Sequence, residues 1–191
     1  MIPISGPWKA GYAFDIHTLK SKHIGDDQYG HPRFHTDRSP IGQSLYNLKY
    51  GQNFSEIENM VNILSSNEDF KNFIKEIDVI VPAPPSNKYR HLQPVILVTQ
   101  EIARMFNKEL RQDIFISSHS EEMKNIDTDE KYDRIKNALH IKGELDKSKS
   151  ILLFDDVFDS GSTLMAMTNI MIEKGYNNIF VFTLTKTRFP D

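Results

Sequence analysis

The chain has 191 residues, a formal net charge of −3 at pH 7, and no cysteine. This length suits one domain with a modest appendage, and a hydrophobic content of 39% allows a sizeable core. The lack of cysteine excludes disulfides and thiolate zinc sites, and the charge argues against a general binder of nucleic acid or membranes. The N-terminus lacks the pattern of a signal peptide, and no apolar stretch approaches the roughly 20 residues that span a bilayer. We therefore expect a cytoplasmic protein.

The first 53 residues form a region of distinct composition, rich in aromatic residues and histidines. Aspartates lie among the histidines, which are His17, His23, His31 and His35. Neutral imidazoles and carboxylates are ligands for zinc or iron, so a metal site is one interpretation. Histidines scattered in a polar loop are the other, because the spacing matches no metal motif. The region ends in a predicted helix, 39–50, with Ser39 as the N-cap and Pro40 as the first helical residue.

From about residue 54 onward, helical and strand patterns alternate. Short apolar runs within 78–82 and 150–154 are typical of strands that are buried on both faces of a parallel sheet. The predicted strands and helices, in chain order, are helices 55–64 and 66–77, strand 78–82, helix 93–106, strand 114–116, helix 129–137, strands 138–142 and 150–154, helix 161–174 and strand 178–185. Strands that alternate with helices need crossover connections. The sequence therefore predicts an α/β fold with a doubly wound, mainly parallel sheet over residues 54–191, and residues 1–53 as an appendage.

One stretch, residues 151–163, carries most of the functional information. An apolar strand leads into two adjacent acids, Asp155 and Asp156, and then into a hydroxyl-rich turn, 159–163, that opens a helix. In open α/β sheets, ligands bind beyond the carboxyl ends of the strands. The unpaired N–H groups at a helix start suit a phosphate. The turn adds hydroxyl donors and a glycine that lets the backbone approach a ligand closely, in the order Asp159, Ser160, Gly161, Ser162 and Thr163.

Paired carboxylates beside a phosphate site suit a polyol, because each carboxylate accepts two hydroxyl hydrogens. The stretch thus predicts a sugar-phosphate site, with the acids on ribose hydroxyls and the turn on a 5-phosphate. The alternative is an ordinary strand–helix junction whose acids and hydroxyls cap the helix. Capping explains one acid or one hydroxyl, but not two acids followed by Asp-Ser-Gly-Ser-Thr.

This pattern resembles the 5-phosphoribosyl-1-pyrophosphate (PRPP) signature of the type I phosphoribosyltransferases. The resemblance implies that Asp155 and Asp156 hold the ribose 2- and 3-hydroxyls and that residues 159–163 cradle the 5-phosphate. It implies magnesium as the cofactor, held at Asp155 and Asp156 through PRPP or water. It also implies the fold of these enzymes, with residues 1–53 as a hood over the ligand end of the sheet, where hoods of this superfamily supply acceptor specificity.

A second loop fits the resemblance, because type I enzymes bind pyrophosphate in a loop after an earlier strand. Here the strand at 79–81 leads into a loop whose candidate residues are Pro84, Pro85, Ser86, Asn87, Lys88 and Arg90. A rigid, solvated loop is the alternative, since prolines are common in such loops. The polar and aperiodic segment 117–128 lies where type I enzymes carry a catalytic flap, and we expect it to be mobile without ligand.

The resemblance narrows to the ComF-like branch. Its members tend to have Pro-x-Pro before basic residues, as in 82–84, and a stretch of arginine, asparagine and alanine before the PRPP strand, as in Arg134, Asn137 and Ala138 with Leu139 after them. They also have a Lys-Tyr segment, as in Lys49-Tyr50. Many of them begin with a four-cysteine zinc module. This chain lacks cysteine, which weakens any transfer of a role in DNA uptake.

Two residues are candidates for chemistry on the acceptor. Asp159 resembles the acid that serves as a base near purine N7 in the hypoxanthine-guanine and xanthine phosphoribosyltransferases. Lys186 follows the last predicted strand, at a point comparable to the lysine that contacts the purine oxo group in those enzymes. The alternatives are a helix N-cap for Asp159 and a solvated strand-end charge for Lys186.

Three functions remain open at this point. The first is an enzyme that transfers phosphoribosyl to or from a nitrogenous, purine-like base. The second is a PRPP- or nucleotide-sensing protein without turnover. The third is a ComF-like accessory protein in DNA handling, which the dispersed cations and the negative net charge disfavour. Oligomeric state is not readable from the sequence, and a homodimer stays open.

Overall fold

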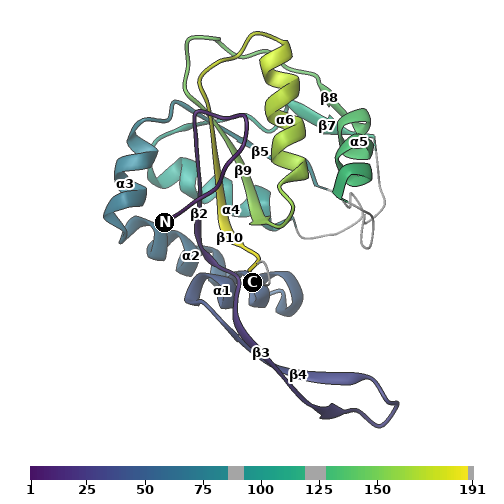
Figure 1. Ribbon diagram of the computed structural model, residues 1–191. Helices are drawn as coiled ribbons and strands as arrows, with labels where there is room; N and C mark the ends of the chain where they lie inside the picture. The colour runs from purple at the N-terminus through teal and green to yellow at the C-terminus, as the bar shows by residue number, and fades with distance from the viewer. Residues whose placement is uncertain (86–92, 119–127, 189–191) are drawn as a thin grey trace.

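The computed structural model describes residues 1–85, 93–118 and 128–188. Within these residues the centre is a six-stranded sheet in the order β1-β2-β10-β9-β5-β6. The strands are β1 (Ile2–Pro3), β2 (Ala10–Ile16), β10 (Ile179–Lys186), β9 (Ile151–Phe158), β5 (Val79–Pro82) and β6 (Glu109–Leu110). Each neighbouring pair is parallel except β1 and β2. This mainly parallel sheet, drawn through the middle of Figure 1, confirms the predicted α/β fold class.

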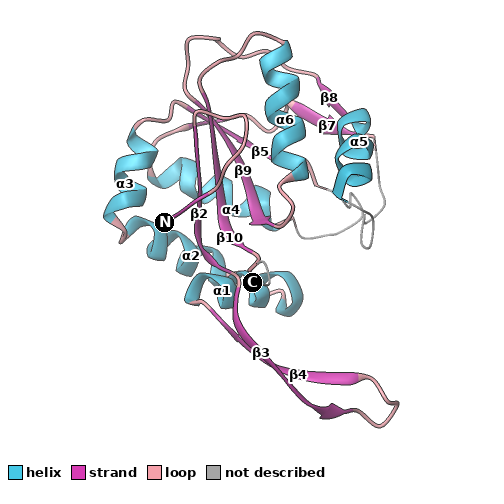
Figure 2. Cartoon of the chain, in the orientation of Figure 1, coloured by secondary structure: helices cyan, strands magenta, loops and turns pink. Residues whose placement is uncertain are grey.

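Helices cover both faces of the sheet (Figure 2). One face carries α1 (Pro40–Gly51), α2 (Ser55–Ser65), α3 (Glu68–Lys75) and α4 (Pro94–Met105). The other face carries α6 (Ser162–Glu173), which α5 (Thr128–Ala138) joins through a 2.7 Å hydrogen bond from Asn169 to the Tyr132 hydroxyl. No helix among the described residues is both long and apolar enough to cross a membrane.

Side chains of β9 alternate between two hydrophobic cores, because successive strand residues point to opposite faces. Leu152 and Phe154 pack with the helices of the α1–α4 face, whereas Ile151 and Leu153 pack with α6. Both cores exclude water from the strand, and each of these four residues is fully buried. The same alternation continues along the strand, so it also determines toward which face of the sheet each of the following acids points.

Residues 10–16 form a strand that the sequence did not predict. β2 pairs in parallel along β10, with Tyr12 opposite Phe182. After it, β3 (Thr18–Asp26) and β4 (Pro32–Arg38) form an antiparallel hairpin that projects away from the sheet in Figure 1. The first 53 residues thus share the central sheet with the rest of the chain, and a role for them as a hood stays a prediction.

The predicted strands at 114–116 and 138–142 both form, as β7 (Phe115–Ser117) and β8 (Leu139–Ile141). They pair with each other in an antiparallel ribbon that is separate from the central sheet. The physical reason is visible in β7, where the middle residue, Ile116, is 47% exposed. A strand with one wet face suits an antiparallel pair better than the interior of a parallel sheet.

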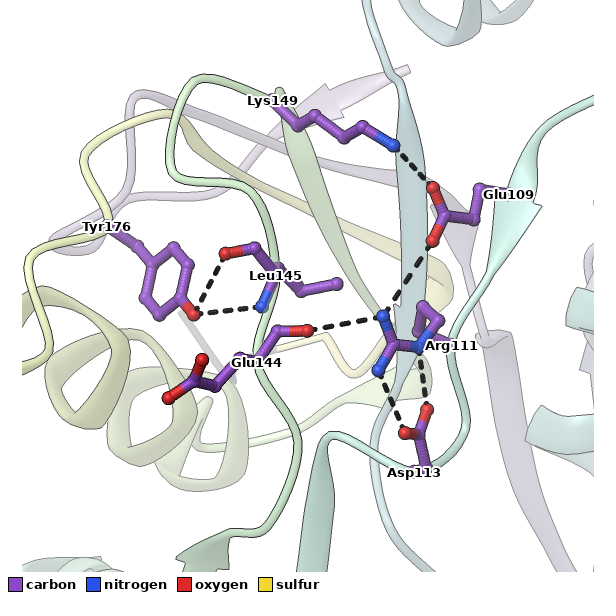
Figure 3. A network of polar contacts seen from close by, with 7 residues as sticks. All are labelled: Glu109, Arg111, Asp113, Glu144, Leu145, Lys149 and Tyr176. Carbon is purple, nitrogen blue, oxygen red and sulfur yellow. Dashed lines mark hydrogen bonds and ion pairs between the residues drawn. The ribbon is translucent and has the colours of Figure 1, made fainter.

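A polar network joins β6 to the segment before β9 (Figure 3). The Arg111 guanidinium donates two hydrogen bonds of 2.8 Å to the Asp113 carboxylate and one of 3.2 Å to the Glu144 carbonyl. Glu109 accepts from Lys149. The network holds an edge of the sheet by charge-assisted bonds, which are stronger than neutral ones.

This network predicts a pH dependence of stability. Hydrogen bonds from Arg111 lower the pKa of Asp113 to about 2, from an ordinary value of 3.8. Because the folded-state pKa is the lower one, the ionised carboxylate stabilises the fold above the ordinary pKa, and the stabilisation is lost as the pH falls from there towards 2. We expect Asp113→Asn to lower the urea unfolding midpoint at neutral pH and to have a shrinking effect as the solution is acidified through this window.

The control for this prediction is the same substitution in an Arg111→Gln background. The guanidinium of Arg111 is the main cause of the lowered pKa of Asp113. Without it, Asp113→Asn should have little effect on the unfolding midpoint at any pH. If Asp113→Asn lowers the midpoint equally at neutral pH and near pH 2, the ionised carboxylate of Asp113 is not the source of the stabilisation.

Candidate functional site

Two adjoining cavities open at the carboxyl edge of the parallel sheet. The larger, about 210 Å³, lies between residues 83–85 after β5, the start of α4, and the acids of β9. The smaller, about 100 Å³, lies among residues 155–164, where β9 turns into α6. Asp155 and Thr163 line both cavities. A ligand with two separated polar groups can therefore occupy both while lying across Asp155.

The two predicted acids lie on β9 itself rather than after it. The strand extends to Phe158, whereas the apolar run had predicted an end at residue 154. Asp156 faces α1, where its Oδ2 lies 2.7 Å from Nζ of Lys49. The Oδ1 atom of Asp155 accepts the N–H of Asp156 at 2.8 Å. Both acids line the larger cavity, as the sequence prediction requires of a pair that binds one ligand.

The turn 159–163 begins α6 in the way the sequence predicted. Gly161 is the N-cap with a φ of 75°, in the left-handed region that favours glycine. The hydroxyls of Ser160 and Ser162 lie 2.8 Å apart, and the Ser160 hydroxyl accepts the Ser162 N–H at 3.4 Å. All five residues of the turn line the smaller cavity. The cavity thus combines hydroxyl groups with the positive end of a helix dipole, which suits an anion.

Asp159 and Lys186 come from neighbouring strand ends. The carboxylate of Asp159 accepts a 3.1 Å hydrogen bond from the hydroxyl of Thr187, the residue after β10. Lys186 is the last residue of β10, and its carbonyl accepts the N–H of His17 at 2.8 Å. The N-cap of α6 is Gly161, so Asp159 does not occupy the N-cap position that was the alternative for it. The roles of Asp159 and Lys186 on an acceptor stay predictions.

His17 and Lys49 belong to this edge, although sequence analysis did not place them there. His17 lies 3.1 Å from the Thr185 hydroxyl through Nδ1. Burial lowers the pKa of His17 from its ordinary value of 6.5, the charges of Lys49 and Arg38 lower it further, and Asp156 opposes them. Its surroundings therefore favour the neutral imidazole. A signal for Lys49 did exist, since it lies one helical turn after the buried Leu45, on a face that turns toward the sheet.

The histidines of the hairpin do not form the metal site that was one interpretation of them. They pair singly with aspartates instead, His23 with Asp26 and His35 with Asp37 at 3.0 and 3.2 Å, and His31 with Asp27 at 3.3 Å. In the described part of the chain, no group of three or more histidine or carboxylate side chains could hold a metal. His23 and His35 lie on opposite faces of the hairpin, because His23 is opposite Phe34 and His35 is opposite Lys22.

The proposed pyrophosphate loop is described only in part. Pro84 and Pro85 line the larger cavity, on the side that faces the acids. The remaining candidates, Ser86, Asn87, Lys88 and Arg90, lie outside the described residues, as does nearly all of the segment 117–128.

Gly161 gives a testable prediction for the turn. A Cβ atom there would lie 2.6 Å from the ring of Phe158, and alanine is strained at this φ. We expect Gly161→Ala to lower the melting temperature by about 2–8 °C from about 1–2 kcal/mol of backbone strain, with a further loss from the contact with Phe158. The matched control is Gly30→Ala, because Gly30 has a φ of 80° and nothing within 4 Å of its added Cβ. An equal shift for both variants would show that the contact with Phe158 does not constrain the turn.

No protein-family model matches the chain, and no curated protein matches it significantly. Among solved structures, it is similar to the adenine phosphoribosyltransferase from Saccharomyces cerevisiae, solved in complex with D-2,5-dideoxy-2,5-imino-altritol 1,6-bisphosphate and adenine. The two share 14% sequence identity with a TM-score of 0.42, over 87% of this chain and 85% of that chain. Likeness at this level leaves activity undecided. The fold class stands on the topology of the chain itself, an α/β protein with a mainly parallel central sheet.

Proposed function

We propose that the carboxyl edge of the sheet binds PRPP with magnesium and transfers phosphoribosyl to or from a nitrogenous, purine-like base. One observation carries the proposal, namely the two adjoining cavities that share Asp155 and Thr163. One of them has a hydroxyl-rich helix start, and the other has an acid pair beside a lysine. This arrangement supports the assignment of the chain to the type I phosphoribosyltransferases, and its Lys49-Tyr50 segment favours the ComF-like branch.

Each part of PRPP has a place in this proposal. The 5-phosphate takes the smaller cavity, where the Ser160 and Ser162 hydroxyls and the N-terminus of α6 provide donors. The ribose lies across Asp155 and Asp156, whose oxygens accept the 2- and 3-hydroxyls. The pyrophosphate takes the larger cavity beside Pro84 and Pro85. The order of these groups along PRPP matches the order of the cavities.

Magnesium fits this site through the substrate rather than through a protein cage. In the described residues only Asp155 and Asp156 stand beside the larger cavity as carboxylates. Magnesium is commonly held by one or two carboxylates together with substrate phosphates. When bound, it would neutralise charge that develops on the pyrophosphate oxygens.

The reaction proposed here exchanges one bond at C1 of the ribose for another. The bond from C1 to the pyrophosphate oxygen breaks, and pyrophosphate leaves with the electron pair. A ring nitrogen of the base forms the new bond to C1 and gives up its proton, for which Asp159 is the candidate base. The protein contributes mainly by holding the two reactants in place and by excluding water from a cation-like transition state.

Calorimetric titration of the wild-type chain with PRPP tests this function. We expect binding that strengthens with magnesium, and competition by ribose 5-phosphate, which shares the groups that contact the acids and the turn. A protein that binds PRPP but releases no pyrophosphate with any base would favour the sensing alternative. No binding of PRPP or of any ribose 5-phosphate compound would overturn the proposal.

A further inference from the structure

Lys49 reaches the site because α1 is held tightly against the link between β2 and β3. The Ser39 hydroxyl caps α1 at the N–H of Gly42 and donates a 2.6 Å bond to the Ile16 carbonyl. At Gly42 a Cβ would lie 2.5 Å from the His17 carbonyl oxygen, so only glycine allows this approach. The last turn of α1 then directs Lys49 toward β9, where its ammonium lies 2.7 Å from Asp156.

The pair of Lys49 and Asp156 lines the larger cavity with little exposure to solvent. The side chains are 17% and 15% exposed, and both border the cavity of about 210 Å³. An ammonium has three N–H donors, so the contact with the one Asp156 oxygen does not occupy them all. A partly buried ion pair adds little net stability, because desolvation offsets the attraction. Stability alone is therefore a weak explanation for a lysine in this place.

Two cations, Lys49 and Arg38, lie near Asp156, and Lys49 borders the cavity itself. Lys49 and Arg38 both act on His17, and Asp156 is the acid that opposes them. Arg38 lies over the ring of Tyr46 at 3.8 Å, and its Nε atom is buried without a hydrogen-bond partner in the described residues. Among the described residues that line the cavity, Lys49 is the one cation, so it is the side chain that can face an anionic group there.

A second group at the same cavity also favours negative charge. α4 begins there, and its first residues, Pro94, Val95 and Ile96, line the cavity opposite the acids. Backbone N–H groups at a helix start have no partner within the helix, and the dipole adds partial positive charge. Lys49 and the start of α4 thus border the same space.

We propose that Lys49 binds the anionic group that the sugar carries at C1, while Asp156, its ion-pair partner, takes the ribose hydroxyls. This inference rests on the function proposed above and adds a binding residue to it from a distant part of the chain. It makes Lys49 selective, because the lysine would recognise ligands with an anion at C1 and ignore a sugar phosphate that lacks one. A lysine that only positioned Asp156 would affect both kinds of ligand alike.

The experiment titrates wild type and Lys49→Met with three probes, each with magnesium: PRPP, inorganic pyrophosphate and ribose 5-phosphate. We expect Lys49→Met to weaken PRPP and pyrophosphate about 10- to 100-fold and to change ribose 5-phosphate less than about twofold. Lys49→Arg, which keeps the charge, should recover part of the loss. The control is Lys75→Met, which removes an exposed lysine from the last turn of α3 and should change none of the three.

The outcomes separate this inference from the proposed function. If wild type binds PRPP and ribose 5-phosphate but Lys49→Met weakens both equally, Lys49 only positions Asp156 and the inference is overturned. An unchanged affinity of Lys49→Met for PRPP also overturns it, while the proposed function stands. If wild type binds none of the three probes, the proposed function fails and this inference fails with it.

Discussion

Replacement of both Asp155 and Asp156 by asparagine is expected to weaken PRPP binding by at least about 100-fold, since two charge-assisted contacts are lost. An amide presents one uncharged acceptor oxygen in place of two charged ones, so it accepts ribose hydroxyls more weakly and cannot assist magnesium as a carboxylate does. The fold should survive, because both acids border a cavity and neither belongs to a hydrophobic core. Titration calorimetry measures the binding, and thermal melting checks the fold.

The matched control is Asp78→Asn, at the opposite end of the sheet. The Asp78 carboxylate accepts the N–H of Ser150 at 2.8 Å, before β5 and β9 begin. Its replacement should lower the melting temperature without changing the affinity for PRPP. A double variant of Asp155 and Asp156 that folds and binds PRPP as wild type does would show that the two acids do not bind PRPP.

Replacement of Asp159 by serine is expected to lower turnover by about 10²- to 10⁴-fold, the usual contribution of a general base. Serine cannot take a proton from the incoming nitrogen at neutral pH. Because the Ser162 N–H already has Ser160 as its acceptor, the loss of Asp159 should change the melting temperature little. The measurement is pyrophosphate release from PRPP across a panel of purine and pyrimidine bases, for wild type and variant.

Thr187→Val is the companion variant, since Thr187 donates to the Asp159 carboxylate at 3.1 Å. Loss of this bond would leave the base present but less well oriented, so we expect a smaller fall in turnover than for Asp159→Ser. Unchanged turnover in Asp159→Ser would leave Asp159 without a chemical role. If no base releases pyrophosphate from wild type, the sensing alternative becomes the better account.

Three adjacent strands at the centre of the sheet were predictable, and the strands that flank them were not. β5, β9 and β10 are apolar runs, a pattern that indicates strands buried on both faces of a parallel sheet. β2 reads Ala-Gly-Tyr-Ala-Phe-Asp-Ile, and its small residues and mixed burial give no strand signal. Its place in the sheet depends on pairing with β10, from which it is separated by most of the chain. Likewise, β9 continues past its acids because β10 pairs with it as far as Phe158.

The same distinction applies to the candidate site. Asp155, Asp156 and the turn 159–163 are contiguous, so a local strand–turn–helix pattern was enough to bring them together. His17 reaches the edge through the pairing of β2 with β10, which no local pattern encodes. The helical pattern places Lys49 on the buried side of α1, but its contact with Asp156 depends on how α1 packs against the sheet. Of the two interpretations of the hairpin histidines, the metal site could not be decided from the sequence, because spacing alone does not show that His23 and His35 lie on opposite faces of an antiparallel pair.

A crystal structure of the protein with PRPP and magnesium tests the central claim most directly. The account predicts the 5-phosphate at the turn 159–163, the ribose hydroxyls on Asp155 and Asp156, and the pyrophosphate in the cavity beside Lys49. Density for PRPP at another place, or a PRPP whose ribose contacts neither acid, would contradict it.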